Sequence, residues 1–288
     1  MKTERPSENI AYLYDGSVEG LFTAVFMTYA NKEHPIDLCP PSHYQPRLGQ
    51  TVREIETDFS LALRVQKGIC RTAGYAVFDL VKIAALSDEE STGMAVYHFI
   101  RYCMNKRNAR FFEQNKKGET LFISKFSTAG CGPSALKDSA APSILHPAVE
   151  PILKLERSVQ NERHRILQFL RFEELEGGLW CARCNPKASV VPLVMDWFAE
   201  RFNIQPFVIY DENHRLAGVY EGSDWHLIKT SSFTPPPRSE NELKMQEAWK
   251  RFYNTLAVEA RYNPELRQQF MPKRFWKNIT EVKDMAPA

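Results

Sequence analysis

Residues 116–145 are the feature that most constrains how this chain folds, because they divide it into two parts. The stretch is rich in glycine, serine, alanine and proline, and a short strand at Leu121–Phe126 is the one element that we expect in it. A connection of this length is uncommon inside a compact domain. We therefore predict an N-terminal part at 1–115, a connecting loop at 116–145 and a C-terminal part at 146–288. With 288 residues, the chain is long enough for both parts to bury a core.

The N-terminal part begins with a predicted strand and a helix. Ala11–Asp15 has the character of a short strand that ends at Gly16. From Val18 onward, apolar residues recur at i, i+3, i+4, i+7 and i+8, which is the spacing of an amphipathic helix. The prolines that follow, at 35, 40, 41 and 46, predict a loop. A second strand and three helices come next, and Ser87 with Glu90 forms a capping box at the start of the last helix. Their predicted ranges are 50–56 for the strand and about 58–70, 75–86 and 87–112 for the helices.

The C-terminal part alternates helices with short strands. A helix is predicted from Pro147 to about Leu167. Gly177 and Gly178 separate two runs of strand-forming residues, which is typical of a hairpin. An amphipathic helix and three further strands follow, and Ser239 caps a last long helix. The apolar stripe of that last helix consists of Met245, Trp249, Phe252, Tyr253 and Leu256. The fold class is therefore α+β, with a mainly helical N-terminal part opened by a strand and a C-terminal antiparallel sheet covered by helices.

Composition and charge exclude several classes of protein. Lysine and arginine total 37 against 35 for aspartate and glutamate, and a net charge of +2 does not by itself favour nucleic acid or a membrane as a partner. No apolar run approaches the length of a transmembrane helix, and the N-terminus lacks the apolar core of a signal peptide. We therefore expect a cytoplasmic protein without a membrane partner. The six cysteines are scattered, which indicates reduced thiols rather than a disulfide framework.

Cys181-Ala-Arg-Cys184 is the motif that most invites a metal or redox site. It lies on a predicted strand, where residues three apart point to opposite faces, so the two thiols cannot share a metal ion without a bulge. No second pair of ligands lies nearby, and redox motifs of this kind stand at the start of a helix. The structural interpretation is therefore favoured, and we expect no metal. The sequence also lacks a P-loop, a GxGxxG fingerprint and a GxSxG elbow, and we expect no cofactor.

Tyr14-Asp15-Gly16-Ser17 stands at the junction between the first strand and the first helix. The N–H groups at a helix N-terminus form a natural anion site. Capping of the helix by Asp15 or Ser17 explains the same residues and is the favoured interpretation. If the protein is an enzyme, a question that the sequence leaves open, Asp15 and Asp211 are the weak candidates for its acid–base group.

Two basic patches remain, one within 106–117 and one near the C-terminus, where aromatic residues alternate with cations. Cations beside aromatic rings suit phosphate contact together with base stacking. A solvated surface around a buried aromatic anchor explains the same pattern equally well. In the nucleic-acid interpretation, the predicted surface consists of Lys273, Arg274 and Lys277 for phosphates, Trp276 for base stacking, and Arg163, Arg165 and Arg171 as its extension.

Several segments, in the same order, resemble a bacterial family described as DNA-metabolism or DNA-repair proteins. YLYDGSVEGLFTAVF at 12–26 resembles the opening of that family. HPAVEPILKLERSVQNERHRI at 146–166 fits the helix that precedes its C-terminal domain, which is a domain of unknown function. That domain is similar to FLRFEELEGGLWCA at 169–182, ERFNIQPFVIYD at 200–211 and QFMPKRFWKNITE at 269–281.

The resemblance implies a role in DNA metabolism and a partner protein. The family accompanies a radical-SAM protein thought to act on DNA, and a domain similar to its C-terminal half occurs fused to uracil-DNA-glycosylase-like proteins. The family usually has other residues where Cys181 and Cys184 stand, which further weakens a metal site. We therefore rank first an accessory protein that binds DNA beside a radical-SAM partner in DNA repair or modification. A scaffold for that partner without nucleic-acid affinity comes second, and an enzyme acting on a nucleobase or nucleotide comes third.

Overall fold

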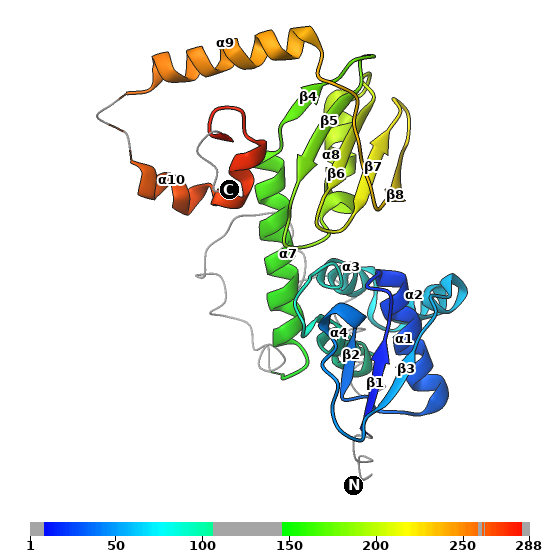
Figure 1. The fold of residues 1–288 in the computed structure, drawn as a ribbon. Helices are drawn as coiled ribbons and strands as arrows, with labels where there is room; N and C mark the ends of the chain where they lie inside the picture. The colour runs from blue at the N-terminus through cyan, green and yellow to red at the C-terminus, as the bar shows by residue number, and fades with distance from the viewer. Residues whose placement is uncertain (1–8, 106–145, 259–260, 262, 284–288) are drawn as a thin grey trace, which may run out of the picture. The chain divides into compact units, whose positions relative to one another are not determined.

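The computed structural model describes residues 9–105, 146–258, 261 and 263–283, and the chain divides into two compact units, Met1–Val159 and Gln160–Ala288 (Figure 1). The division falls within helix α7 (Glu150–Phe169), so the first half of α7 belongs to the N-terminal unit and its second half to the C-terminal unit. The connecting loop predicted at 116–145, its short strand, and the basic patch at 106–117 lie outside the described residues and stay predictions.

Three parallel strands form the sheet of the N-terminal unit. β1 (Ile10–Leu13) lies between β2 (Asp37–Cys39) and β3 (Thr51–Glu54), and the register places Tyr12 opposite Leu38. β1 and β3 lie where the sequence predicts strands. β2 lies where the prolines predict a loop, so the prediction is wrong at this point. The prolines at 35 and 40 flank the strand without entering it, and its backbone N–H groups therefore remain able to pair.

Helices α1, α2, α3 and α4 complete the core of this unit. They span Val18–Asn31, Phe59–Ala73, Tyr75–Ala84 and Thr92–Met104, in that order. Leu21, Phe22 and Val25 of the predicted apolar stripe of α1 are buried in this core, together with residues of β1, α3 and α4. Tyr29, at the end of the stripe, is 44% exposed. The first half of α7 adds Ile152 and Leu155 to the same core. The stripe spacing, a local property of the sequence, thus identifies the buried face correctly.

Two features of α4 depart from the local sequence signals. The helix begins at Thr92, so the capping box predicted from Ser87 and Glu90 is wrong. The residues from Ser87 to Glu90 form the turn before the helix, where the Ser87 hydroxyl accepts a hydrogen bond from a backbone N–H. One residue into the helix, α4 approaches β2 so closely that a Cβ at Gly93 would lie 1.9 Å from the carbonyl oxygen of Leu38. This position therefore admits no side chain.

The C-terminal unit is built on a sheet with the strand order β4-β5-β6-β7-β8 within the described residues. These strands span Phe172–Glu174, Trp180–Cys184, Phe207–Asp211, Leu216–Tyr220 and Trp225–Lys229, in that order. β5 and β6 are parallel because α8 (Val191–Phe202) crosses between them, and the other neighbours are antiparallel. The α+β fold class is therefore confirmed, and the sheet is mixed rather than antiparallel as predicted. The predicted hairpin joins β4 to β5, where Gly177 and Gly178 have φ values of 86° and 80° that favour glycine.

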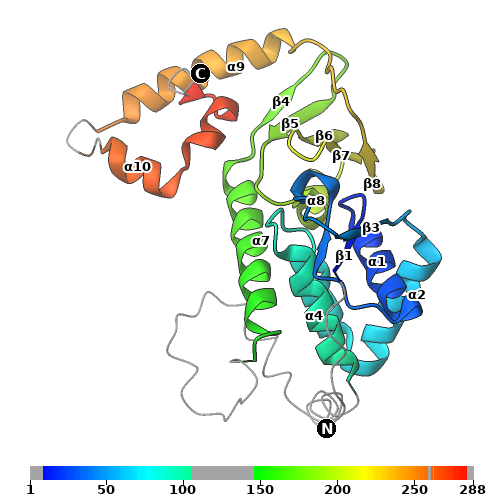
Figure 2. The ribbon, with the colours of Figure 1, turned by 60° about the horizontal axis from the view of Figure 1, so that its bottom comes forward.

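After β8 the chain forms α9 (Glu240–Leu256), α10 (Pro264–Phe270) and the 3₁₀ helix η5 (Lys273–Asn278). Ser239 caps α9 as predicted, because its hydroxyl accepts a hydrogen bond from the N–H of Glu242 at 3.0 Å. α9 extends away from the β4 edge of the sheet in both ribbon views (Figures 1 and 2). Gln246 is the one buried residue of α9, so the predicted apolar stripe of this helix lies exposed. None of the helices in the described part of the chain is both long enough and apolar enough to cross a membrane.

Candidate functional site

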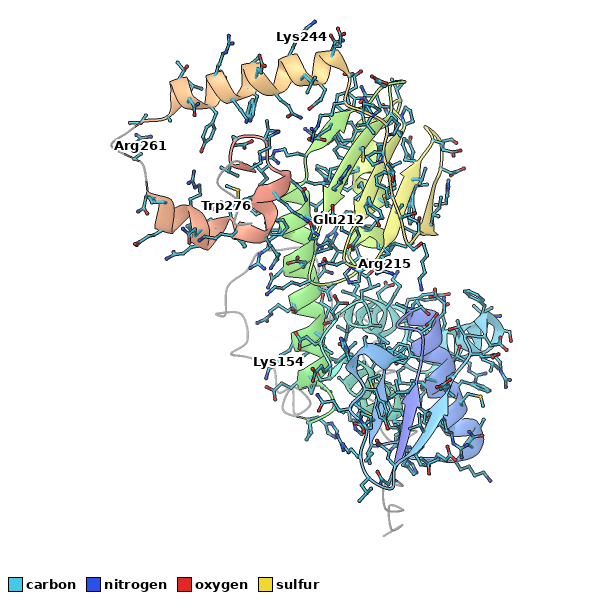
Figure 3. The ribbon with its side chains drawn as sticks, in the orientation of Figure 1. Lys154, Glu212, Arg215, Lys244, Arg261 and Trp276 are labelled. Atoms are coloured by element: carbon cyan, nitrogen blue, oxygen red, sulfur yellow. The ribbon has the colours of Figure 1, made fainter. Side chains whose placement is uncertain are left out.

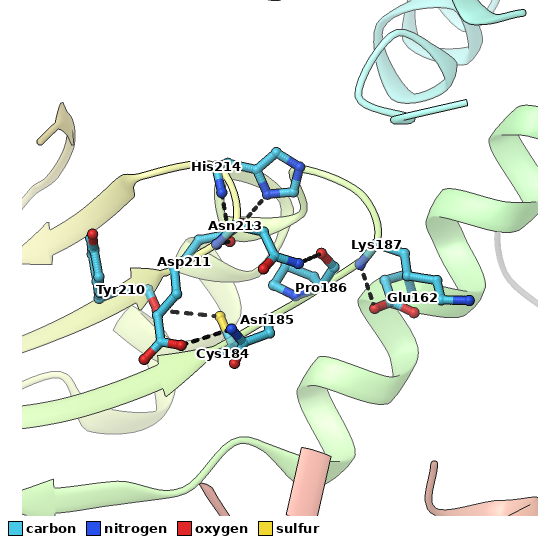
Figure 4. Close-up of polar contacts among 10 residues, drawn as sticks. Glu162, Cys184, Asn185, Pro186, Lys187, Tyr210, Asp211, Asn213 and His214 are labelled. Carbon is cyan, nitrogen blue, oxygen red and sulfur yellow. Dashed lines mark hydrogen bonds and ion pairs between the residues drawn. The ribbon is translucent and has the colours of Figure 1, made fainter. Parts of the chain in front are cut away.

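Glu162, on the second half of α7, is the acid that two of the predicted basic residues, Arg165 and Arg274, contact. It is 2% exposed, and it occupies the buried stripe that also includes Leu155, Val159 and Ile166. One carboxylate oxygen accepts the backbone N–H of Lys187 at 2.9 Å (Figure 4). A carboxylate at such a position must be paired, because an isolated buried charge is strongly unfavourable.

Two arginines provide that pairing. Arg274 of η5 donates from a terminal guanidinium nitrogen to the second Glu162 oxygen at 2.5 Å, and a nitrogen of Arg165 lies 3.5 Å from the same oxygen. Burial lowers the pKa of Arg274, and the charge of Arg165 lowers it further, while Glu162 raises it. Two guanidinium groups thus share one carboxylate. The cluster of Glu162, Arg165 and Arg274 therefore carries one positive charge in excess.

Three other predicted cations, Lys277, Arg171 and Arg163, have separate partners. Lys277 donates to Glu212 at 2.6 Å. Arg171 lies 3.7 Å from Glu281 and also donates to backbone carbonyl oxygens at the end of α7. Arg163 donates to the carbonyl oxygen of Leu193 at 3.0 Å, so its side chain points toward α8. Residues two apart on a helix point in nearly opposite directions, and Arg163 therefore lies on the opposite side of α7 from Arg165. The structure therefore brings Arg165 and Arg274 together and places Arg163 elsewhere.

Trp276 does not offer a stacking surface. Its side chain is 4% exposed, and its indole N–H donates to the carbonyl oxygen of Met271 at 2.9 Å. The guanidinium of Arg267 lies 5.2 Å from the ring centroid. The neighbouring Phe275 is also buried and packs against Phe169 of α7, with ring centroids 5.4 Å apart. The prediction that a base stacks on Trp276 is wrong in this fold, because η5 uses the two rings to anchor itself.

The junction Tyr14-Asp15-Gly16-Ser17 forms a helix cap. The Ser17 hydroxyl accepts the N–H of Gly20 at 2.9 Å, and an Asp15 carboxylate oxygen accepts the backbone N–H of Ser17 at 2.9 Å and its hydroxyl at 2.5 Å. Burial raises the pKa of the Tyr14 phenol, and the nearby acidic groups raise it further. Because Asp15 orients the capping serine, the interpretation of this junction as an acid–base site loses its main support.

Asp211 closes the turn between β6 and β7. It is fully buried, and one oxygen accepts the backbone N–H groups of Asn213 and His214 at 3.0 and 3.1 Å (Figure 4). The other oxygen lies 2.5 Å from Nδ1 of His214. This pattern is that of an Asx turn, in which the aspartate stabilises the local backbone. The second candidate acid–base group thus also has a structural role.

Cys181 and Cys184 lie on β5, and both side chains are buried. Burial raises the pKa of Cys181 to about 11, and burial raises that of Cys184 well above its usual range, with Asp211 and Glu212 adding to the effect. The thiol of Cys184 donates to the carbonyl oxygen of Tyr210 at 3.6 Å (Figure 4). Only the thiolate is a good nucleophile or metal ligand. Within the described ranges, no group of three or more His, Cys, Asp and Glu side chains is arranged to hold a metal ion.

We expect Cys181 and Cys184 to resist alkylation by iodoacetamide in the folded protein at about pH 8. With a pKa near 11, Cys181 is ionised in only about one molecule in a thousand at that pH. The partly exposed Cys70 is the internal comparison and should react faster. Peptide mapping by mass spectrometry assigns the labelled residues, and denaturation in urea should make all of them reactive. Faster labelling of Cys181 or Cys184 than of Cys70 would contradict this prediction.

The sequence analysis missed a group of exposed aromatic side chains on α9. Trp249 and Phe252 are 44% and 53% exposed, and their rings lie 5.7 Å apart with an interplanar angle of 30°. They line a groove together with Tyr253, Arg261 and Arg267. The stripe spacing reveals that these residues share a face. It does not reveal that these rings stay about half exposed in the described chain.

Comparison with known protein families identifies a match to the C-terminal part of the chain. The domain of unknown function DUF4130 matches residues 134–281, slightly more than half of the chain. This range includes α7, the five-stranded sheet and the helices α8, α9, α10 and η5. No curated protein matches the sequence.

Proposed function

The chain belongs to the family defined by the domain of unknown function DUF4130, and we propose its function from the basic cluster around Glu162, because the family name assigns no activity. The protein binds nucleic acid as an accessory factor in DNA repair or modification, and it works beside a radical-SAM protein. Segments from both ends of the chain resemble a DNA-metabolism family. This resemblance supports a role in DNA repair or modification and a radical-SAM protein as the partner. The charges around α7 and η5 support the contact with phosphate.

The unbalanced charge of the cluster is the observation that carries this proposal. Arg165 and Arg274 share the single carboxylate of Glu162, and Lys273 is exposed at the start of η5, next to Arg274 in sequence. A guanidinium group has five N–H donors, and pairing with a carboxylate uses one or two of them. The donors that remain are suited to phosphate oxygens, which arginine binds with charge-assisted hydrogen bonds.

The double variant Arg165→Gln with Lys273→Gln tests the proposal by fluorescence anisotropy with labelled single-stranded and duplex DNA. Wild-type protein should bind with an affinity that falls steeply with salt. The variant should bind about tenfold or more weakly at low salt, with a shallower salt dependence, because each lost phosphate contact removes one released counterion. Neutral glutamine is preferred to glutamate here, since a new carboxylate beside the buried Glu162 would destabilise the fold.

A matched control removes the same charge elsewhere on the C-terminal unit. Lys229 lies on the outer strand β8, and Lys244 lies on α9 (Figure 3); both are exposed. The double variant Lys229→Gln with Lys244→Gln should keep the wild-type affinity and salt dependence. The proposal fails if wild-type protein shows no salt-dependent binding, or if the Arg165 and Lys273 variant binds as the wild type does.

A protein-interaction scaffold is the second candidate function, and the exposed apolar residues of α9 and α10 favour it. Leu243, Met245 and Leu256 on α9 and Leu266 and Phe270 on α10 are all about half exposed or more. Monomeric soluble proteins rarely leave large contiguous apolar surface in water. A scaffold would bind the radical-SAM partner in a pull-down through this surface and would show no DNA affinity at low salt.

A further inference from the structure

The groove between α9 and α10 has features that a simple surface helix lacks. It encloses about 550 Å³, and Trp249, Phe252 and Tyr253 line it on the α9 side. A helix of this length normally buries its apolar face, because packing of that face supplies most of its stability. Here Gln246 alone is buried on α9. The apolar face of α9 is therefore open to a ligand.

The aromatic rings of this groove are held in place. The indole N–H of Trp249 donates to a carboxylate oxygen of Glu281 at 3.0 Å, which fixes one edge of the ring. Phe252, one turn further along α9, stacks on it at 5.7 Å. A ring fixed at its edge and exposed elsewhere offers its face at little cost in conformational entropy. Such a face suits a flat, unpaired base.

Two arginines accompany the rings. Arg261 is exposed where the chain passes from α9 toward α10 (Figure 3), and Arg267 lies on α10. The guanidinium of Arg267 is oriented by its contact with Trp276. The groove therefore combines apolar ring faces with positive charge. Proteins that bind single-stranded nucleic acid use both features: the bases stack on aromatic rings, and cationic side chains contact the phosphate backbone.

We propose that the groove between α9 and α10 binds single-stranded nucleic acid, with bases stacked on Trp249 and Phe252 and phosphates held by Arg261 and Arg267. This inference rests on the proposed function and deepens it, since it names the form of nucleic acid and moves the stacking surface from Trp276 to α9. The cluster around Glu162 contacts phosphate in any strand, whereas the groove requires unpaired bases. Single-stranded ligands should therefore bind more tightly than duplexes.

The test titrates the full chain into fluorescein-labelled oligothymidylate of about 12 nucleotides, a length within the range that single-strand sites cover. Trp249→Ala and Phe252→Ala should each weaken binding roughly tenfold, because each removes one stacking surface. Phe252→Tyr keeps a ring and should retain near wild-type affinity. Leu243→Ala, at an exposed α9 position outside the groove lining, is the matched control and should leave affinity unchanged. Circular dichroism checks that each variant is folded.

Arg261→Gln is a second, independent variant, because an exposed arginine can be replaced without removing apolar contacts. It should weaken oligothymidylate binding and reduce its salt dependence. If oligothymidylate binds but the ring variants and Arg261→Gln bind it as the wild type does, the groove is not the site. In that case the proposed function still stands on the loss seen in the Arg165 and Lys273 variant.

Two further outcomes separate the inference from its alternatives. If the wild type binds no DNA in any form, the proposed function fails and the inference fails with it. If a designed acidic amphipathic peptide binds the wild type but not Trp249→Ala, and oligothymidylate does not compete with it, the groove is a protein-docking site and the inference is overturned. Competition by oligothymidylate, with quenching of tryptophan fluorescence that Trp249→Ala abolishes, would support it.

Discussion

Replacing Gly93 with alanine is expected to destabilise the N-terminal unit by about 3 kcal/mol, the upper part of the range for overpacking a core. The new Cβ would lie 1.9 Å from the carbonyl oxygen of Leu38, which is backbone and cannot rotate away. α4 would have to move off β2 to accommodate it. Urea unfolding followed by circular dichroism measures the loss. Hydrogen exchange should accelerate in the peptides of α4 and β2.

Gly68 provides the matched control for this substitution. It lies inside α2, and the nearest atom to an added Cβ would be the terminal methyl carbon of Met104 at 3.3 Å. That methyl belongs to a flexible side chain and can shift. Alanine also has a helix propensity that exceeds that of glycine by about 1 kcal/mol, so Gly68→Ala should be neutral or stabilising. Equal destabilisation by both substitutions would show that the contact at Gly93 is not the cause.

Replacing Glu162 with alanine should cost the C-terminal unit about 3 kcal/mol, because it removes one member of a buried ion pair. The half-buried guanidinium of Arg274 would lose its carboxylate, and the N–H of Lys187 would lose its acceptor. All five tryptophans of the chain lie at or after residue 180, so tryptophan fluorescence in urea reports on this unit alone. The transition midpoint should fall to a lower urea concentration.

Two comparisons identify the buried charge as the cause. Glu173→Ala breaks an ion pair with Arg238 whose two side chains are 31% and 45% exposed, and it should cost less than about 1 kcal/mol. Combining Glu162→Leu with Arg274→Met replaces the buried pair by apolar residues of similar size and should recover most of the stability. If the double substitution is as unstable as Glu162→Ala, an unpaired arginine does not explain the loss.

Sequence patterns predict correctly those helices and turns whose formation depends on residues close to them in the sequence. The apolar spacing after Val18 identifies the buried face of α1, and Gly177 with Gly178 supplies the positive φ values of the β4–β5 turn. Ser239 caps α9 through a residue three positions away. By contrast, β2 has only three residues and exists through pairing with β1. Its formation depends on a partner that lies far from it in the sequence.

The candidate site is less predictable for the same physical reason. The sequence identifies Arg274 as a cation, but its partner Glu162 is 112 residues away. One signal does point to Glu162, because this acid interrupts the apolar stripe of α7, and a buried acid requires a cation. The burial of Trp276 and the exposure of Trp249 follow from how η5 and α9 pack. Residue type alone does not distinguish these two tryptophans.

The central position of β1 has a consequence for how the protein is made. Both neighbours of β1 follow it in the chain, and the last of them ends at Glu54. Ribosomes add about 5–20 residues per second, so roughly 2–8 s pass between synthesis of Leu13 and Glu54. β1 therefore leaves the ribosome that much earlier than β3, and during the interval this buried-type strand is exposed with an unpaired edge, which is the condition that favours aggregation. We expect nascent chains from which β1 but not β3 has emerged to engage chaperones, and chains from which α4 has emerged to release them.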